Sequence, residues 1–193
     1  AYTGTHNYDI GVNLAKLVMK VKPHGGTVCI QSGGAAAANH NERMQGIRDT
    51  LAGKKSAESP GVRLTGQNGW TEIAGCPLYN NDDFPLSIVQ MTDILAKYPK
   101  LDAMLNAGGA PQMLPQAYRQ LLANYEERIK SGDLVLLFVE TMDVQMKFLK
   151  EGLSNGQVGQ RPYEMGYRAM YVLNDLTNGK TPPDPITVGL DVC

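Results

Sequence analysis

The chain has 193 residues, of which 42% are hydrophobic and 19% are charged, and its formal net charge is −1 at pH 7. Domains usually contain about 100–150 residues, so this length allows one large domain, or one domain with fragments of another. The nearly balanced charge gives no sign of the basic surface that binding to nucleic acid or anionic lipid requires. No apolar run approaches the ~20 residues of a membrane-spanning helix.

Short apolar runs alternate with segments of helical periodicity, a pattern typical of an α/β fold with a mainly parallel sheet. Helices are marked by apolar residues three and four positions apart, and the continuous apolar run 134–139 suits a strand covered on both faces. In chain order we expect a helix at 7–22, a strand at 27–30, a helix at 39–51, an added loop or hairpin at 61–69, a strand at 70–74, a helix at 84–98, a strand at 103–106, a helix at 112–129, a strand at 134–139, a helix at 143–153, a strand at 157–160, a helix around 165–176 and a strand at 186–190.

The three cysteines, Cys29, Cys76 and Cys193, match no zinc-binding spacing and include no C-x-x-C pair. Cys29 lies inside the apolar run 27–30, where a buried and inert thiol is the expected state. Cys76 and Cys193 could form a disulfide in an oxidising compartment, which requires their Cα atoms to lie within ~7 Å of each other.

Recognisable catalytic and metal-binding patterns are absent from the sequence. No G-x-S-x-G elbow occurs, and His6, His24 and His40 lie outside any triad or metal-ligand spacing. Gly33-Gly34 stands between an expected strand and helix, where backbone N–H groups can bind phosphate, but it fits neither GxGxxG nor GxxxxGK(S/T). We therefore expect no catalytic residue, no metal ligand and no cofactor, with a nucleotide-using α/β enzyme as an alternative.

Polar side chains follow several of the expected strands at the point where each strand ends. Ligands of open α/β sheets bind at this carboxyl edge, and carbohydrate requires planar donors and acceptors that hold hydroxyl groups. Each of these side chains alone could equally cap a helix or form a surface ion pair, but several at one edge favour a binding site. The candidate ligand-binding residues are Arg43, Asp82, Asp83, Glu140 and Gln160.

Four stretches of the sequence carry a likeness to a known family. Residues 3–11 read TGTHNYDIG, residues 25–30 read GGTVCI, residues 41–47 read NERMQGI and residues 95–103 read LAKYPKLDA. They resemble the hinge-to-helix segment (G-T-D-N-x-x-x-G), the "GGKV … x-E-R-x-x-G-F" block and the "LL-x-x-HPD-x-x-A" stretch of type I periplasmic binding proteins. Glu151-Gly152 and residues 156–166 resemble the segment that crosses back between the two lobes of that family. The likeness is greatest to the ribose- and galactose-type sugar receptors of ABC importers.

The resemblance implies roles for the candidate residues. Arg43 matches the arginine that clamps sugar hydroxyl groups, Glu140 falls where the family has a ligand-binding aspartate, and Gln160 falls on the glutamine at the last crossover. Asp82 lies near a position that is often aromatic or acidic. The family's Asn-Asp pair after the strand at 103–106 is replaced here by Gly108-Gly109.

The resemblance also implies an architecture: a three-layer α/β sandwich as one of two lobes that close on a sugar about a hinge. Residues 1–160 would form the carboxy-terminal ligand-binding lobe, 161–183 a crossover segment belonging to a missing amino-terminal lobe, and 184–193 a final strand returning to the carboxy-terminal lobe. The implied function is that of a solute-binding subunit of an ABC sugar importer, not an enzyme. Its partners would be a small-molecule sugar and the ABC permease, with no nucleic acid, and with the membrane reached only through the permease. The implied location is periplasmic, or lipid-anchored and extracytoplasmic.

Proteins with other functions share this fold. The effector-binding core of a transcriptional repressor and the sensor domain of a membrane receptor are both alternatives to the importer subunit. A helix-turn-helix before residue 1 would favour the repressor, a transmembrane helix the sensor, and a signal peptide the importer. Turnover of a nucleotide would favour an enzyme.

Overall fold

The computed structural model describes residues 1–193 and contains one large and one small sheet. In the large sheet the strands lie in the order β3-β2-β5-β6-β7-β9, and β4 also pairs with β2. All pairs are parallel except β7 with β9, which confirms the expected α/β fold with a mainly parallel sheet. The strands are β2 (Gly26–Ser32), β3 (Trp70–Glu72), β4 (Leu78–Tyr79), β5 (Ala103–Asn106), β6 (Val135–Val139), β7 (Gly156–Gly159) and β9 (Asp191–Val192).

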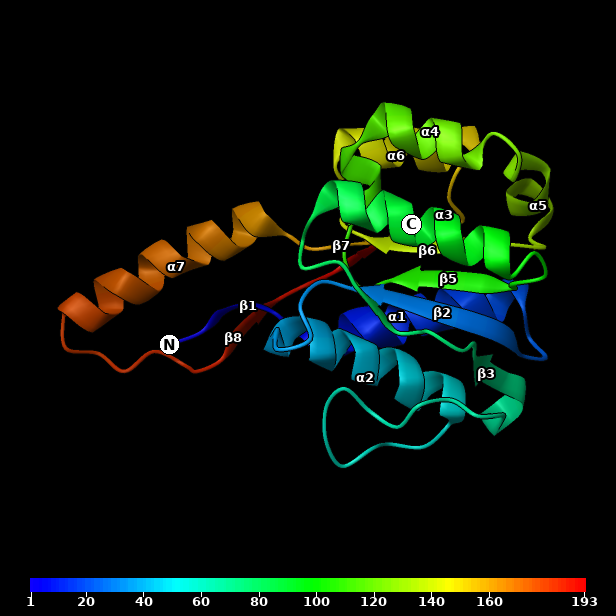
Figure 1. Ribbon diagram of the computed structural model, residues 1–193. Coiled ribbons are helices and arrows are strands. Elements are labelled where there is room, and N and C mark those ends of the chain that lie inside the picture. Colours follow the sequence, from blue (N-terminus) through cyan, green and yellow to red (C-terminus); the bar gives the residue numbers. More distant parts are fainter.

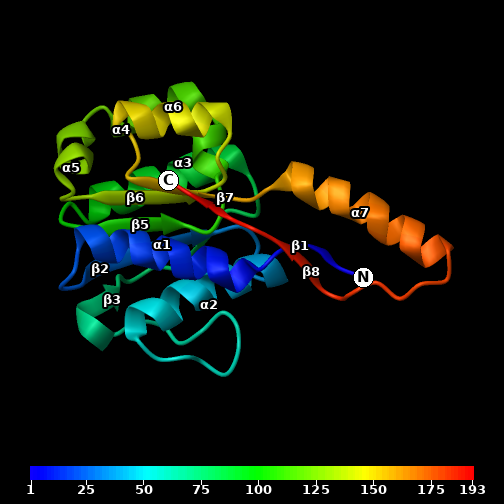
Figure 2. The same ribbon diagram turned by 180° about the vertical axis from the view of Figure 1, so that it is seen from behind.

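Helices cover both faces of the large sheet, so the lobe has three layers (Figures 1 and 2). On β6, Val135, Leu137 and Val139 belong to the core on one face of the sheet, whereas Leu136 and Phe138 belong to the core on the opposite face. This alternation explains why the run 134–139 is continuously apolar. One layer consists of α1 (Asn7–Val21) and α2 (Ala38–Ala52), and the other of α3 (Phe84–Lys97), α4 (Pro115–Leu122), α5 (Glu126–Ser131) and α6 (Asp143–Glu151).

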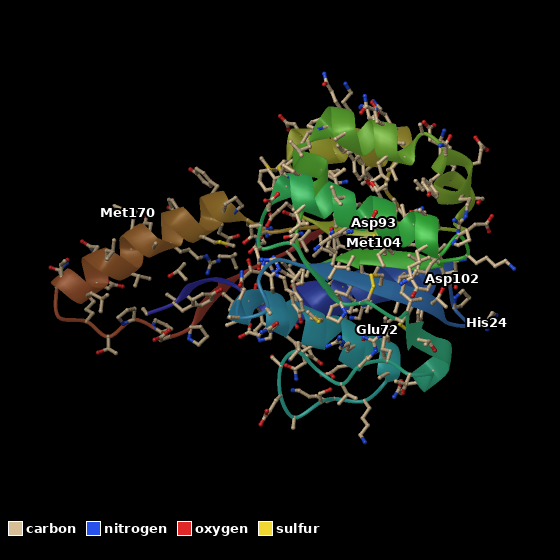
Figure 3. All side chains as sticks on the ribbon, viewed as in Figure 1. His24, Glu72, Asp93, Asp102, Met104 and Met170 are labelled. Carbon is tan, nitrogen blue, oxygen red and sulfur yellow. A yellow bond between two sulfur atoms is a disulfide. The ribbon has the colours of Figure 1, made fainter.

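The small sheet joins the two ends of the chain. β1 (Thr3–Thr5) pairs in parallel with β8 (Ile186–Val188) outside the large sheet. Between β7 and β8 the chain forms α7 (Pro162–Thr177), which extends away from the three-layer body (Figures 1 and 2). Large apolar side chains of α7 are exposed, among them Tyr163 at 86% and Met170 at 67%, and Figure 3 shows Met170 far from the body. None of the helices, α7 included, combines the length and the hydropathy that a membrane span requires.

The possible Cys76–Cys193 disulfide does not form, and the expectation that Cys29 is a free, inert thiol is wrong. Cys76 is bonded to Cys29, both half-cystines are buried, and Cys193 is an exposed free thiol. The strand order explains the pairing. Cys29 lies in β2, and the segment between β3 and β4 that carries Cys76 runs along the same edge of β2. Cys193 follows β9, which forms the opposite edge of the sheet.

Two expected elements differ from the observed ones, and the segment 61–69 forms the expected loop. The helix expected at 112–129 is broken into a 3₁₀ turn η2 (Ala110–Met113), α4 and α5. Pro115 lacks a backbone N–H and begins α4, which separates it from η2. The strand expected at 186–190 ends at Val188 as β8, which pairs with β1, and a separate strand β9 follows it at Asp191 and pairs with β7. The segment 61–69 is a loop with a 3₁₀ turn η1 (Gln67–Gly69) and one antiparallel bridge, Thr65 to Thr71.

Candidate functional site

A cavity of about 270 Å³ opens at the carboxyl ends of the parallel strands. These strands point toward the side from which α7 extends (Figure 1), whereas His24 and Asp102 mark the opposite end of the sheet (Figure 3). The walls of the cavity come from the segments after β2, β4, β5 and β6 and from α2. The polar and aromatic side chains that line it are Gln31, Ser32, His40, Arg43, Asn80, Asp82, Phe84, Asn106 and Glu140.

Arg43 is a buried cation that no carboxylate pairs with. Its side chain comes from α2, its residue is only 5% exposed, and burial lowers the pKa of its guanidinium. Nε donates to Asn7 Oδ1 at 3.0 Å and Nη1 donates to the Ala107 carbonyl at 2.9 Å. A guanidinium carries five N–H groups, so three remain without an acceptor in the protein. Because burying a charge is costly unless it is hydrogen-bonded, these donors favour an oxygen-rich ligand in the cavity.

Three acceptor atoms of the cavity are buried and have no partner in the protein: Gln31 Oε1, Ser32 Oγ and Asn106 Oδ1. Gln31 and Asn106 are neighbours in the β2–β5 register. Their amide nitrogens are engaged elsewhere: Gln31 Nε2 donates to Ser87 O at 2.9 Å, and Asn106 Nδ2 donates to Leu137 O at 3.3 Å. Both amide oxygens are therefore held in place and open to hydroxyl donors. Buried polar atoms are rarely left unpaired, so their number here favours a ligand rich in hydroxyl groups.

His40 is a hydrogen-bond donor of fixed orientation. Its Nδ1 accepts the backbone N–H of Gly33 at 3.1 Å. Burial, reinforced by the charge of Arg43, lowers the pKa of the imidazole below its usual value. A neutral ring whose Nδ1 is an acceptor carries its proton on Nε2. His40 therefore adds a further N–H group to the donors of Arg43.

Glu140 and Gln160 are brought together, but only Glu140 lines the cavity. Glu140 follows β6 with φ at +85°, a backbone conformation that costs energy in any residue except glycine. Gln160 Nε2 donates to Glu140 Oε1, and Gln160 Oε1 accepts the hydroxyl of Thr5 at 2.9 Å. Gln160 thus links the small sheet to the cavity carboxylate and lies behind it rather than in the cavity wall.

Asp82 and Asp83 have different positions. Asn81 and Asp82 have φ values of +51° and +58°, and this turn places Asp82 in the cavity wall beside Gly33. Asp83 lies outside the cavity, because its carboxylate accepts the backbone N–H of Leu86 at 2.8 Å and caps α3. The turn at Asn81-Asp82 determines which of the two carboxylates is available to a ligand.

Sequence patterns did not identify five polar residues and one aromatic residue of the site: Gln31, Ser32, His40, Asn80, Asn106 and Phe84. Gln31, Ser32 and Asn106 were readable as polar residues that end apolar runs, but His40 gave no signal, because only the fold places it beside Gly33. Phe84 fitted the apolar spacing of a helix, yet it is 41% exposed and lines the cavity at the start of α3. An aromatic face beside polar groups is what binding of a sugar ring requires.

Comparisons with known proteins give one family match and several structures of the same fold. The family described as "Periplasmic binding protein domain" matches residues 1–181. A solute-binding protein of an ABC transporter from Burkholderia graminis, in complex with D-arabinose, is 26% identical with a TM-score of 0.77 over 98% of this chain and 60% of that one. A search of curated proteins gives no match.

Two further structures share the fold at lower identity. GanP, a glucose-galactose binding protein from Geobacillus stearothermophilus, is 20% identical with a TM-score of 0.80 over 100% of this chain and 61% of that one. An ABC transporter solute-binding protein from Agrobacterium vitis with bound D-fucose is 21% identical, with a TM-score of 0.79 over 98% and 58%. The chain thus spans about three fifths of the length of the structures that it matches.

Proposed function

Because the chain belongs to the periplasmic binding protein domain family, we propose that it is part of the solute-binding subunit of an ABC importer and that it binds a sugar. The observation that supports this most directly is the pairing of free donors with free acceptors in one cavity. Arg43 keeps three N–H groups, while Gln31 Oε1 and Asn106 Oδ1 are buried without partners. Sugar hydroxyl groups donate and accept at once, so one ligand satisfies both sets.

The binding interaction involves no chemical step. The N–H groups of Arg43 and His40 donate to hydroxyl oxygens of the sugar, and Asp82 and Glu140 accept hydroxyl protons through charge-assisted hydrogen bonds. Phe84 packs its ring against the apolar face of the sugar. The structures matched above, one with D-arabinose and one with D-fucose, hold ligands of this class.

We assign the chain to two lobes. Residues 1–160 and 184–193 belong to the carboxy-terminal lobe, and residues 161–183 cross to an amino-terminal lobe. The exposed apolar face of α7 supports this assignment, because apolar surface of this extent normally packs against another part of the protein. The pairing of β1 with β8 then forms part of the hinge, and closure of the lobes buries the sugar.

An extracytoplasmic location, periplasmic or lipid-anchored, follows from the same proposal. The buried Cys29–Cys76 disulfide supports it, because structural disulfides persist in oxidising compartments and are rare in the cytosol. The partner outside the ligand site is the permease of the importer, which the closed form engages at the membrane.

Isothermal titration calorimetry with D-arabinose, D-galactose, D-glucose and D-fucose tests the proposal. We expect the full-length protein to bind at least one of these sugars, and the 193-residue chain to bind it much more weakly, since it supplies only part of the cleft. Failure of the full-length protein to bind any sugar, or nucleotide turnover, would contradict the proposal. Stimulation of the importer's ATPase by the sugar-loaded protein separates the importer subunit from a repressor core or a sensor.

A further inference from the structure

The segment 139–142, which we call the Glu140 turn, is held at both ends by one buried side chain. Gln145, in the first turn of α6, donates from Nε2 to the Val139 carbonyl at 3.0 Å. Its Oε1 accepts the backbone N–H of Met142 at 3.1 Å. Between these two contacts lies Glu140, with φ at +85°. The amide of Gln145 therefore bridges the residues on either side of an energetically unfavourable backbone conformation.

A second glutamine fixes the orientation of this amide. Gln145 Nε2 also donates to Gln112 Oε1 at 2.8 Å, and Gln157 Nε2 donates to the same oxygen at 3.1 Å. All three glutamines are 0% exposed. A flipped Gln145 amide would place its oxygen against two acceptor oxygens, so only one orientation satisfies the surroundings.

Gly109 leaves the space that the Gln145 amide occupies. A Cβ at Gly109 would lie 2.7 Å from Gln145 Nε2 and 3.0 Å from the Val139 carbonyl oxygen. The φ of Gly109 is −117°, which any residue adopts, so its backbone conformation does not require glycine. The requirement at this position is for space.

We propose that Gln145 and Gly109 are positioning residues of the sugar site: Gln145 holds the Glu140 turn so that the carboxylate faces the cavity, and Gly109 admits the Gln145 amide. This rests on the function proposed above. Gln145 does not line the cavity, whereas Gly109 lines it with backbone atoms alone. A disordered Glu140 turn must be ordered again when the sugar binds, and this cost weakens binding.

Two measurements test the proposal on Gln145→Met, which keeps the bulk of the side chain but removes its hydrogen bonds. Hydrogen exchange of the sugar-free protein should show loss of protection at the Met142 amide, because its acceptor is gone. Calorimetry on the full-length protein should show sugar binding weakened by about tenfold or more. Gly109→Ala should reproduce both effects. In a Gln145→Ala background most of its effect should be lost, because the amide that the new Cβ would displace is gone and only the 3.0 Å approach to the Val139 carbonyl oxygen remains.

Matched controls separate positioning from general destabilisation. Ser154→Ala removes a hydroxyl that accepts from Gln157 in the same buried network but lies away from the Glu140 turn. Gly34→Ala adds a Cβ with no atom nearer than 3.8 Å. Both controls should leave sugar affinity unchanged. Unaltered exchange at Met142 and unaltered affinity in Gln145→Met would overturn the proposal, as would an equal loss of affinity in Ser154→Ala. A wild-type protein that binds no sugar would instead overturn the proposed function, and the exchange result would still show whether Gln145 holds the turn.

Discussion

Replacement of Arg43 by lysine keeps the charge in the cavity but removes the planar arrangement of donors. Arg43 uses Nε for Asn7 and one Nη1 hydrogen for Ala107, which leaves three N–H groups for a sugar. A lysine ammonium has three N–H groups on a single nitrogen and cannot reach both protein acceptors and the sugar. Loss of one charge-assisted hydrogen bond costs about 2 kcal/mol, so we expect Arg43→Lys to weaken sugar binding about 30-fold.

Calorimetry on the full-length protein measures this effect, and Arg48→Lys is its matched control. Arg48 lies on the same helix, is 4% exposed, and donates to Glu72 from Nε at 2.7 Å and from Nη2 at 2.8 Å. It does not line the cavity. Its replacement should lower the stability of the fold without changing sugar affinity. An affinity within twofold of wild type in Arg43→Lys, or an equal loss in Arg48→Lys, would refute the role assigned to Arg43.

Two further predictions concern stability. The lowered pKa of His40 means that the folded state resists protonation, so its contribution to stability should be complete above pH ~6.5 and should decrease as the pH falls below that value. Thermal unfolding of wild type and His40→Gln between pH 7.5 and 5 tests this, and parallel pH profiles would contradict it. Removal of the Cys29–Cys76 disulfide, which spans 47 residues, should lower the free energy of unfolding by about 2–4 kcal/mol in urea titrations. Cys193→Ser should leave it unchanged, and an equal loss in that variant would refute the structural role of the bond.

The fold was predictable to the extent that it depends on local patterns. The run 134–139 is apolar at every position because both of its faces are covered, and the sequence predicts this strand without further information. The cysteine pairing was not predictable in this way. It depends on the order of strands in the sheet, which places Cys76 beside Cys29 and leaves Cys193 at the far edge. Strand order follows from the packing of the whole chain, and no local pattern encodes it.

The residues of the candidate site were predictable where a polar residue ends a strand. They were less predictable at the turn before α3, where the backbone conformation decides which of two adjacent side chains lines the cavity. Asp82 and Asp83 are adjacent and chemically identical, and either could cap α3. The left-handed conformations of Asn81 and Asp82 make Asp83 the cap and leave Asp82 to the cavity. Asn and Asp tolerate this conformation better than most residues, so the sequence allowed the turn but did not fix its register.

Gly108-Gly109 shows that a departure from a family pattern can have a role the pattern does not indicate. From the sequence, the replacement of the family's polar pair by two glycines puts a direct ligand contact at these positions in doubt. In the structure, Gly109 admits Gln145, whose amide holds the turn that carries Glu140. The residues that would contact a sugar can be matched to a family one at a time, because each has its own chemistry. The residues that support them cannot be matched in this way. The role of Gly109, for example, can be inferred only when the side chain of Gln145 is known to lie against it.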